Sequence, residues 1–365
     1  MMAIRVLIAA GGTGGHIYPG LAVAKEIVRR DPESVVRFVG TAKGLETRLV
    51  PQAGFELSLI ESAGLVNMGL RERVRGMAVL PKSFAAARRL IREFRPDAVV
   101  GAGGYVSGPV LLTAALMRVP TLVMESNAVP GFTNRTLARF VRAAAVSFEA
   151  ALPYFRGKGV VTGNPVRREF FDIPEKEIDT NAFSLLIFGG SQGARAVNEA
   201  MVAALPHLAA RRDALRVTHQ TGKLDFEKVR QGYEAAGWAG RADVREYIDD
   251  MVSAFTSADL IISRAGATTS FELMAAGRPA IMVPLPGQLE QRKNAEALQQ
   301  AGAAKMILQP ELTGERLAKE IDALASDPAR VAEMGRAARR LARGDAAATT
   351  VDMIEKLIGS RESGV

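Results

Sequence analysis

The sequence contains no cysteine, only three histidines and no long hydrophobic run. The absence of cysteine excludes disulfide bonds, thiolate zinc sites and cysteine nucleophiles, and it suits a reducing compartment. A membrane-spanning helix needs roughly 18 apolar residues in a row. The first residues, MMAIR, lead directly into a strand pattern without the features of a signal peptide. We therefore expect a cytoplasmic protein that is soluble or peripherally bound to a membrane.

The 365 residues alternate short apolar runs with longer helical patterns. A chain of this length exceeds one ordinary core, so two domains are expected. Runs that are apolar throughout are typical of parallel strands covered on both faces. We expect strands at residues 4–9, 35–39, 97–100, 121–124, 143–147 and 159–162, and then at 184–188, 215–219, 243–247, 259–263, 280–283 and 305–308.

This order of elements predicts an α/β fold with two doubly wound parallel sheets. Gly163 and Pro165 interrupt the pattern near the middle of the chain, which favours a domain boundary there. We expect one domain at residues 1–163 and a second at 164–345. A final helix, from about residue 346, has no strand of its own and is expected to pack back on the first domain.

Two glycine-rich turns each follow an apolar strand and precede a helical pattern. They cover residues 11–16 (GGTGGH) and 189–194 (GGSQGA). Such turns bring backbone N–H groups and the positive end of a helix to one point, which suits a phosphate; tight strand–helix packing is the alternative for each turn alone. Neither turn matches the G-x-G-x-x-G or P-loop pattern, and the second expected strand ends FVGT without the acidic residue that holds an NAD ribose. A dinucleotide or ATP is therefore disfavoured.

His16 lies in the first helical turn after the first glycine turn. Because a cation is disfavoured at a helix N-terminus, we expect a lowered pKa and a neutral imidazole suited to a general base; a structural role is the alternative. His219 ends a strand and is interpreted as structural, and His207 as part of the surface. Without an Asp-x-Asp motif we expect no metal site, although Asp249 and Asp250 leave one open.

A third turn, residues 264–272 (RAGATTSFE), also follows a strand and opens a helix. Small residues permit close approach of a ligand, and hydroxyls with helix-end amides bind phosphate. Glu272 is suited to accept hydrogen bonds from ribose hydroxyls. Ordinary helix capping by a glutamate in the first turn is the alternative.

A basic segment lies at about residues 64–95. Its part from 71 to 95 holds eight basic and two acidic residues, which is most of the surplus in a chain of net charge +8. The interleaved residues are mainly aliphatic, which serves base stacking poorly and disfavours nucleic acid. A solvated amphipathic helix is the alternative; we favour an anionic membrane surface.

The glycine turns occur in order with two further motifs, residues 103–109 (GGYVSGP) and 163–167 (GNPVR). Together these motifs resemble the MurG family of N-acetylglucosaminyltransferases, over residues 4 to 345. The resemblance implies a GT-B fold, in which two Rossmann-like domains face each other across a cleft. It also implies an inverting transfer of GlcNAc from UDP-GlcNAc to lipid I (undecaprenyl-diphosphate-MurNAc-pentapeptide). The product is lipid II, made without a metal or another cofactor at the cytoplasmic face of the inner membrane.

The resemblance further implies roles for individual residues. At the donor these are Thr13, Gly14, Gly15 and Asn127 for the sugar, Arg167 and Ser191 for the diphosphate, the Ile248 backbone for uracil, Ala267, Thr268, Thr269, Ser270, Phe271 and Glu272 for diphosphate and ribose, and Gln291 for the sugar hydroxyls. His16 is hypothesised to be the base or positioning group at the acceptor hydroxyl. Ser126 and Gln288 replace residues more usual in the family.

Rival functions remain open. A UDP-GlcNAc 2-epimerase or a GT-B transferase acting on another lipid would share the two-domain plan. A non-catalytic nucleotide-sensing protein would bind the donor and leave the acceptor unchanged.

Overall fold

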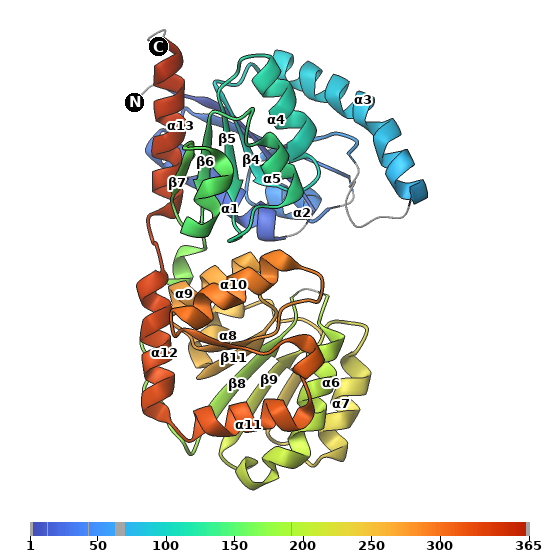
Figure 1. The fold of residues 1–365 in the computed structure, drawn as a ribbon, viewed down its shortest axis with the longest axis vertical. Helices are drawn as coiled ribbons and strands as arrows, with labels where there is room; N and C mark the ends of the chain where they lie inside the picture. The colour runs from blue at the N-terminus through green and yellow to red at the C-terminus, as the bar shows by residue number, and fades with distance from the viewer. Residues whose placement is uncertain (1–2, 13, 43, 63–69, 191, 363–365) are drawn as a thin grey trace. The chain divides into compact units, whose positions relative to one another are not determined.

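The computed structural model describes residues 3–12, 14–42, 44–62, 70–190 and 192–362. The chain folds as two compact units: the first comprises residues 1–167 and 343–365, and the second comprises residues 168–342. Each unit contains one parallel β-sheet with helices packed on it (Figure 1). The expected α/β class with two parallel sheets is confirmed.

The sheet of the first unit has, within the described residues, seven strands in the order β3-β2-β1-β4-β5-β6-β7. They are β1 (Arg5–Ala10), β2 (Val35–Gly40), β3 (Glu56–Leu59), β4 (Ala98–Gly103), β5 (Thr121–Glu125), β6 (Ala143–Val146) and β7 (Gly159–Val161). Strands β4 and β5 are buried along their whole length, which explains their continuous apolar sequences. The strand order reverses between β1 and β4, the place where doubly wound sheets bind ligands.

Helices cover both faces of this sheet. They are α1 (Gly14–Arg30), α2 (Glu46–Gln52), α3 (Leu70–Phe94), α4 (Ser107–Leu116), α5 (Phe132–Leu137) and α13 (Ala346–Glu362), with the 3₁₀ helix η1 (Glu149–Phe155). Helices α1, α2 and α13 contribute to one core, and α3, α4 and α5 to the other. Figure 1 shows α13 running alongside the first unit. Arg30 of α1 fixes it there through ion pairs of 2.6 Å with Asp352 and 3.2 Å with Glu355.

The sheet of the second unit has the order β10-β9-β8-β11-β12-β13 among the strands that the structure describes. They are β8 (Phe183–Phe188), β9 (Leu215–Gln220), β10 (Ala242–Arg245), β11 (Leu260–Ser263), β12 (Ala280–Met282) and β13 (Ala304–Met306). The helices are α6 (Arg195–Ala204), α7 (Phe226–Ala235), α8 (Met251–Ser257), α9 (Ala267–Ala276), α10 (Leu289–Gln300), α11 (Gly314–Ala325) and α12 (Pro328–Leu341), with the 3₁₀ helices η2 (Arg168–Phe170), η3 (Leu205–Arg211) and η4 (Gln309–Glu311). The chain's one tryptophan, Trp238, lies in the core of this unit.

All the expected strands are present, and β3 is an additional one. Its four residues (ELSL) alternate polar and apolar side chains and are only partly buried. This pattern arises because β3 is an edge strand, paired only with β2 among the described residues. An edge strand needs no continuous apolar run, so the criterion that found the central strands does not detect it.

Candidate active site

The carboxyl ends of β1, β4 and β5 form a candidate site in the first unit. Because these strands are parallel and adjacent, the loops that follow them meet at one edge of the sheet. The loops enclose a pocket of about 280 Å³, which we call the glycine-turn pocket. It is lined by residues 11, 12, 16, 102–105, 124–127 and 131–134.

His16 lines this pocket from the first turn of α1. Burial disfavours the imidazolium and lowers the pKa of His16, while a hydrogen bond to the Ala102 carbonyl opposes the change. The direction agrees with the expectation from sequence, and burial is its largest cause. A Cβ at Gly103 would lie 2.2 Å from Nδ1 of His16, so a glycine is required there. The imidazole is therefore held neutral at the wall of the pocket.

Glu125, at the end of β5, organises the opposite side of the pocket. Its Oε1 accepts the backbone N–H of Asn127 at 2.8 Å and the side-chain amide of the same residue at 3.1 Å. Its Oε2 accepts from the N–H of Gly131 at 3.1 Å and from the side chain of Asn134 at 2.8 Å. Burial raises the pKa of Glu125, and these hydrogen bonds oppose the rise. The carboxyl group fixes the loop that carries Asn127.

Of the predicted sugar-contacting residues of the first unit, the structure places Asn127 in the lining of this pocket, and Gly14 and Gly15 are not among the lining residues. Gly14 and Gly15 form the first turn of α1 and are partly exposed. Asn127 and His16 line the same pocket. Thr13 lies outside the described residues.

Arg167 and Ser126 each contact another residue of the first unit. The Arg167 guanidinium lies over the ring of Tyr18, 5.8 Å from its centroid, and Arg167 is not among the residues that line the glycine-turn pocket. Ser126 donates from its hydroxyl to Oδ1 of Asn164 at 2.7 Å. The serine found in place of the family's usual residue thus ties the pocket to the segment that follows β7.

The second glycine turn, after β8, is joined to the loop that follows β10. The buried side chain of Gln220 makes the connection: its Nε2 donates to the Gly190 carbonyl at 3.0 Å, and its Oε1 accepts from the N–H of Ile248 at 2.9 Å. The structure therefore brings Ile248 together with the glycine turn. Ser191 lies outside the described residues.

Helix α9 presents an uncapped N-terminus at the end of β11. Its first six residues are the predicted set Ala267, Thr268, Thr269, Ser270, Phe271 and Glu272. No side chain caps the helix at Gly266, and Oγ1 of Thr268 is buried without a hydrogen-bond partner among the described residues. Glu272 lies in the second turn, not the first, so the capping alternative is wrong. The amides and the Thr268 hydroxyl are suited to an anion.

Two side chains fix the loop around α10. The Oε1 of Gln291 accepts from the N–H of Leu285 at 3.0 Å, and the buried Asn294 donates to the carbonyl of Ala265 at 3.2 Å. Gln288 begins α10 as its N-cap residue, without a side-chain capping bond. Gln291 is therefore held beside the β12–α10 loop.

The contacts of His219 and Asp250 are those of structural residues. The fully buried His219 contacts the hydroxyl of Tyr233 at 3.1 Å and Oδ1 of Asn198 at 3.0 Å, and burial lowers its pKa to about 3. Asp250 caps α8 by accepting from the N–H of Ser253 at 3.0 Å. Across the described part of the chain, no three His, Asp or Glu side chains cluster as metal ligands would.

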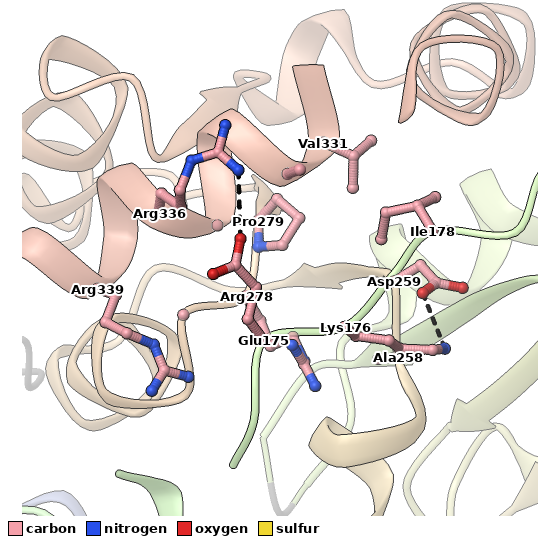
Figure 2. Close-up of a pocket in the computed structure, with 13 residues that line it drawn as sticks. Glu175, Lys176, Ile178, Ala258, Asp259, Arg278, Pro279, Val331, Arg336 and Arg339 are labelled. Carbon is pink, nitrogen blue, oxygen red and sulfur yellow. Dashed lines mark hydrogen bonds and ion pairs between the residues drawn. The ribbon is translucent and has the colours of Figure 1, made fainter. Parts of the chain in front are cut away.

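A cavity lined by cationic side chains in the second unit is structural. Figure 2 shows Lys176 paired with Asp259 and Arg336 paired with Glu175 across it. Arg278 donates to the backbone carbonyls of Pro174, Phe255 and Thr256. Arg339 donates to the backbone carbonyls of Phe171, Ile173 and Ala276. Their charges hold the chain entering the second unit against α9 and α12.

Sequence reasoning missed Glu125, Gln220 and Glu46, which organise the loops of these sites. Glu125 ends an apolar strand, and an acidic residue in that position is a detectable signal. Glu46 and Gln220 carry no local signal, because their importance depends on contacts with loops distant in sequence.

Two doubly wound units, each with a glycine turn at the carboxyl ends of its strands, define the class of a two-domain α/β protein with a candidate phosphate-binding turn in each domain. None of the helices that the structure describes combines the length and the hydrophobicity of a membrane-spanning segment.

Comparison with known proteins identifies the family. The glycosyltransferase family 28 N-terminal domain matches residues 6–146, and the C-terminal domain of that family matches residues 184–351. The UDP-N-acetylglucosamine–N-acetylmuramyl-(pentapeptide) pyrophosphoryl-undecaprenol N-acetylglucosamine transferase of Anaeromyxobacter sp. (strain Fw109-5) is 48% identical over 98% of this chain and 94% of its own length. The chain belongs to this family of glycosyltransferases, and it is an N-acetylglucosaminyltransferase of peptidoglycan synthesis.

Solved structures agree with this assignment. The crystal structure of Acinetobacter baumannii MurG is 36% identical, with a TM-score of 0.80 over 97% of this chain and 99% of that one. UDP-GlcNAc 2-epimerase from Neisseria meningitidis has a TM-score of 0.71 at 14% identity, over 97% of this chain and 100% of that one. The second likeness concerns the fold alone, and the epimerase alternative is not favoured.

Proposed function

We propose that this chain transfers GlcNAc from UDP-GlcNAc to the 4-hydroxyl of the MurNAc unit of lipid I, forming lipid II with inversion at the anomeric carbon. The observation that carries the proposal is the 48% identity, over nearly the full length of both chains, to a transferase named for this donor and acceptor. The pocket with a neutral histidine in the first unit and the uncapped helix in the second supply the chemistry that this reaction needs.

The donor is assigned to the second unit. The amides and hydroxyls at the start of α9 and the glycine turn with Ser191 would receive the diphosphate, together with Arg167, which belongs to the first unit. The Ile248 backbone would meet uracil, Glu272 the ribose hydroxyls and Gln291 the sugar. A helix end that is uncapped stabilises the negative charge that develops on UDP as it leaves.

The acceptor is assigned to the glycine-turn pocket. His16 removes the proton of the MurNAc 4-hydroxyl as the oxygen forms its bond to the anomeric carbon and the bond to the UDP oxygen breaks. Because burial lowers its pKa, the imidazole is free to accept that proton at neutral pH. The resulting imidazolium then releases the proton to solvent. Thr13, Gly14, Gly15 and Asn127 would contact the transferred sugar from the same unit.

A membrane face is assigned to the basic segment at about residues 64–95. Residues 64–69 lie outside the described residues; the segment from Leu70 forms α3. Arg88, Arg89 and Arg92 are exposed along α3, and α4, which packs against it, exposes Leu116 to 73%. Basic residues beside exposed apolar ones bind anionic lipid surfaces. We assign this surface to the cytoplasmic leaflet that carries lipid I, with no role in nucleic-acid binding.

Incubation with labelled UDP-GlcNAc and a lipid I analogue tests the function. The expected product is the disaccharide lipid, released with UDP, and no product forms when the acceptor is omitted. Conversion of UDP-GlcNAc alone would indicate an epimerase instead. Donor binding without turnover of the acceptor would indicate a nucleotide-sensing protein.

A further inference from the structure

Glu46 is a fully buried carboxylate behind the first glycine turn. It is the first residue of α2, and its exposed fraction is 0%. Its Oε2 accepts from the N–H of Gly12 at 3.0 Å, and its Oε1 accepts from the N–H and the hydroxyl of Thr41 at 2.8 and 2.9 Å. Buried acidic side chains are normally paired with cations. Here the described residues offer Glu46 no ion pair, so three neutral donors satisfy it.

Glycines make the space that this side chain occupies. A Cβ at Gly40 would lie 2.4 Å from Cγ of Glu46, and one at Gly44 would lie 1.8 Å from its Oε2. A Cβ at Gly11 would lie 3.0 Å from Oε1. A side chain larger than that of glycine at either of the first two positions would displace the Glu46 side chain from this place. The backbone around Glu46 is therefore shaped to this one side chain.

The contact with Glu46 fixes the conformation of the first glycine turn. Gly12 has a positive φ of 91°, its N–H is donated to Glu46, and its carbonyl accepts from the N–H of Leu45 at 3.3 Å. The neighbouring carbonyl of Gly11 lies so close to Gly104 that a Cβ there would be 2.2 Å away. Both glycine segments line the glycine-turn pocket. Through its hydrogen bond with Gly12, Glu46 thus fixes the part of the pocket wall that the first glycine turn forms.

We propose that Glu46 is a positioning residue for the acceptor: it holds the first glycine turn in the conformation that receives the acceptor's diphosphate, without touching either substrate. This inference rests on the proposed function. Because the Gly12 N–H is already donated inward, the anion is bound by other amides of the turn and the start of α1. Donors that are fixed in advance need no reorganisation when the substrate arrives.

The variant Glu46→Gln tests this role. An amide keeps the size of the side chain but replaces one acceptor oxygen with a donor, so Gly12 or Thr41 loses its partner. We expect kcat/KM for a lipid I analogue to fall about tenfold, mainly through a higher KM for the acceptor. The Kd for UDP should change by less than about twofold, because the segments proposed to bind UDP, apart from Arg167, belong to the second unit. Thr41→Val, which removes the hydroxyl, should give a smaller loss of the same kind. Thr41→Ser, which keeps the hydroxyl, should retain the wild-type kcat/KM.

Glu26→Gln is the matched control. Glu26 is a carboxylate on α1 whose ion pairs are with Arg29 and Arg30 of the same helix, away from the contacts of Gly12, so its loss should leave the acceptor KM unchanged. Amide hydrogen exchange adds a readout that needs no substrate. Glu46→Gln should speed exchange in residues 8–17 and leave residues 183–194 of the second unit unchanged.

The inference is overturned if folded Glu46→Gln and Thr41→Val proteins keep the wild-type kcat/KM for the acceptor. It is also overturned if the Kd for the donor rises by as large a factor as the KM for the acceptor. Should Glu46→Gln fail to fold, the two Thr41 variants decide the matter. Absence of turnover by the wild-type protein would instead contradict the proposed function, and exchange at residues 8–17 would still test the positioning role.

Discussion

Two histidines in this chain have lowered pKa values for the same physical reason and different consequences. His16 and His219 are both disfavoured as cations by burial. His16 lines a pocket, whereas the two ring nitrogens of His219 are occupied by Tyr233 and Asn198. A base must reach its substrate, so accessibility separates the candidate base from the structural residue.

His16→Ala should lower turnover by about 100-fold or more, because it removes the proposed proton acceptor. UDP binding should be nearly unchanged. Since the pKa of His16 is lowered in the protein without substrate, the acid limb of the wild-type kcat/KM–pH profile should lie below pH 6.5. His207→Ala, the same substitution at an exposed position, is the control. Wild-type turnover in His16→Ala would remove this residue from the mechanism.

His219 should make the stability of the second unit depend on pH. Its pKa is about 3 when folded, against an ordinary value of 6.5, so the unfolded chain binds the proton first as pH falls. Stability is therefore fully present above pH 6.5 and is lost progressively between pH 6.5 and 3, by roughly 5 kcal/mol in all. Urea unfolding followed by Trp238 fluorescence reports on this unit. In His219→Gln this part of the pH dependence should disappear; an unchanged slope would contradict the assignment.

The buried carboxylates mark the limit of what single residues reveal in sequence. Residues 11–16 and 264–272 were predicted as turns because glycine, hydroxyls and a preceding strand are local signals. The environment of Glu46 depends on Gly12, which is 34 residues away. Such a contact is created by the pairing of β1 with β2 and is absent from any short window of sequence.

At the scale of elements, strand–turn–helix units were the predictable part. The central strands have continuous apolar sequences, and the turns after β1, β8 and β11 were all expected at their places. The edge strand β3 was missed because it lacks such a run. The helical position of Glu272 was also predicted wrongly from its local sequence, because α9 begins early enough to place this residue in the second turn.

Helix α3 should determine binding to anionic membranes. Reversing the exposed Arg88, Arg89 and Arg92 to Glu should lower co-flotation with phosphatidylglycerol liposomes at least about tenfold, since each basic residue near such a surface contributes about 1 kcal/mol. Figure 1 shows α3 at the outer edge of the first unit.

The matched control reverses three exposed basic residues of the second unit, Arg212, Arg216 and Lys228. It changes the net charge equally and should leave flotation nearly unchanged. Equal losses in both triple variants would point to net charge and not to α3.

At the scale of the whole molecule, the assignment of donor and acceptor to different units makes a prediction about ligand protection. UDP alone should slow amide hydrogen exchange at residues 246–250 and 266–272, because these hold the uridine diphosphate in the proposal. UDP-GlcNAc should extend protection to residues 14–17, since the sugar is assigned to the first unit. Stronger protection of residues 14–17 than of 266–272 by UDP alone would reverse the two roles.

The return of the chain to the first unit at residue 343 has a consequence for biosynthesis. Helix α1 is made early, but the apolar side chains of α13 that cover part of its surface, Val351 and Ile354, are made after the whole second unit. At about 5–20 residues per second, the roughly 300 intervening residues take about 15–60 s to synthesise. Throughout that time this apolar surface of the nascent first unit is available to chaperones. The unit that begins first is thus completed last.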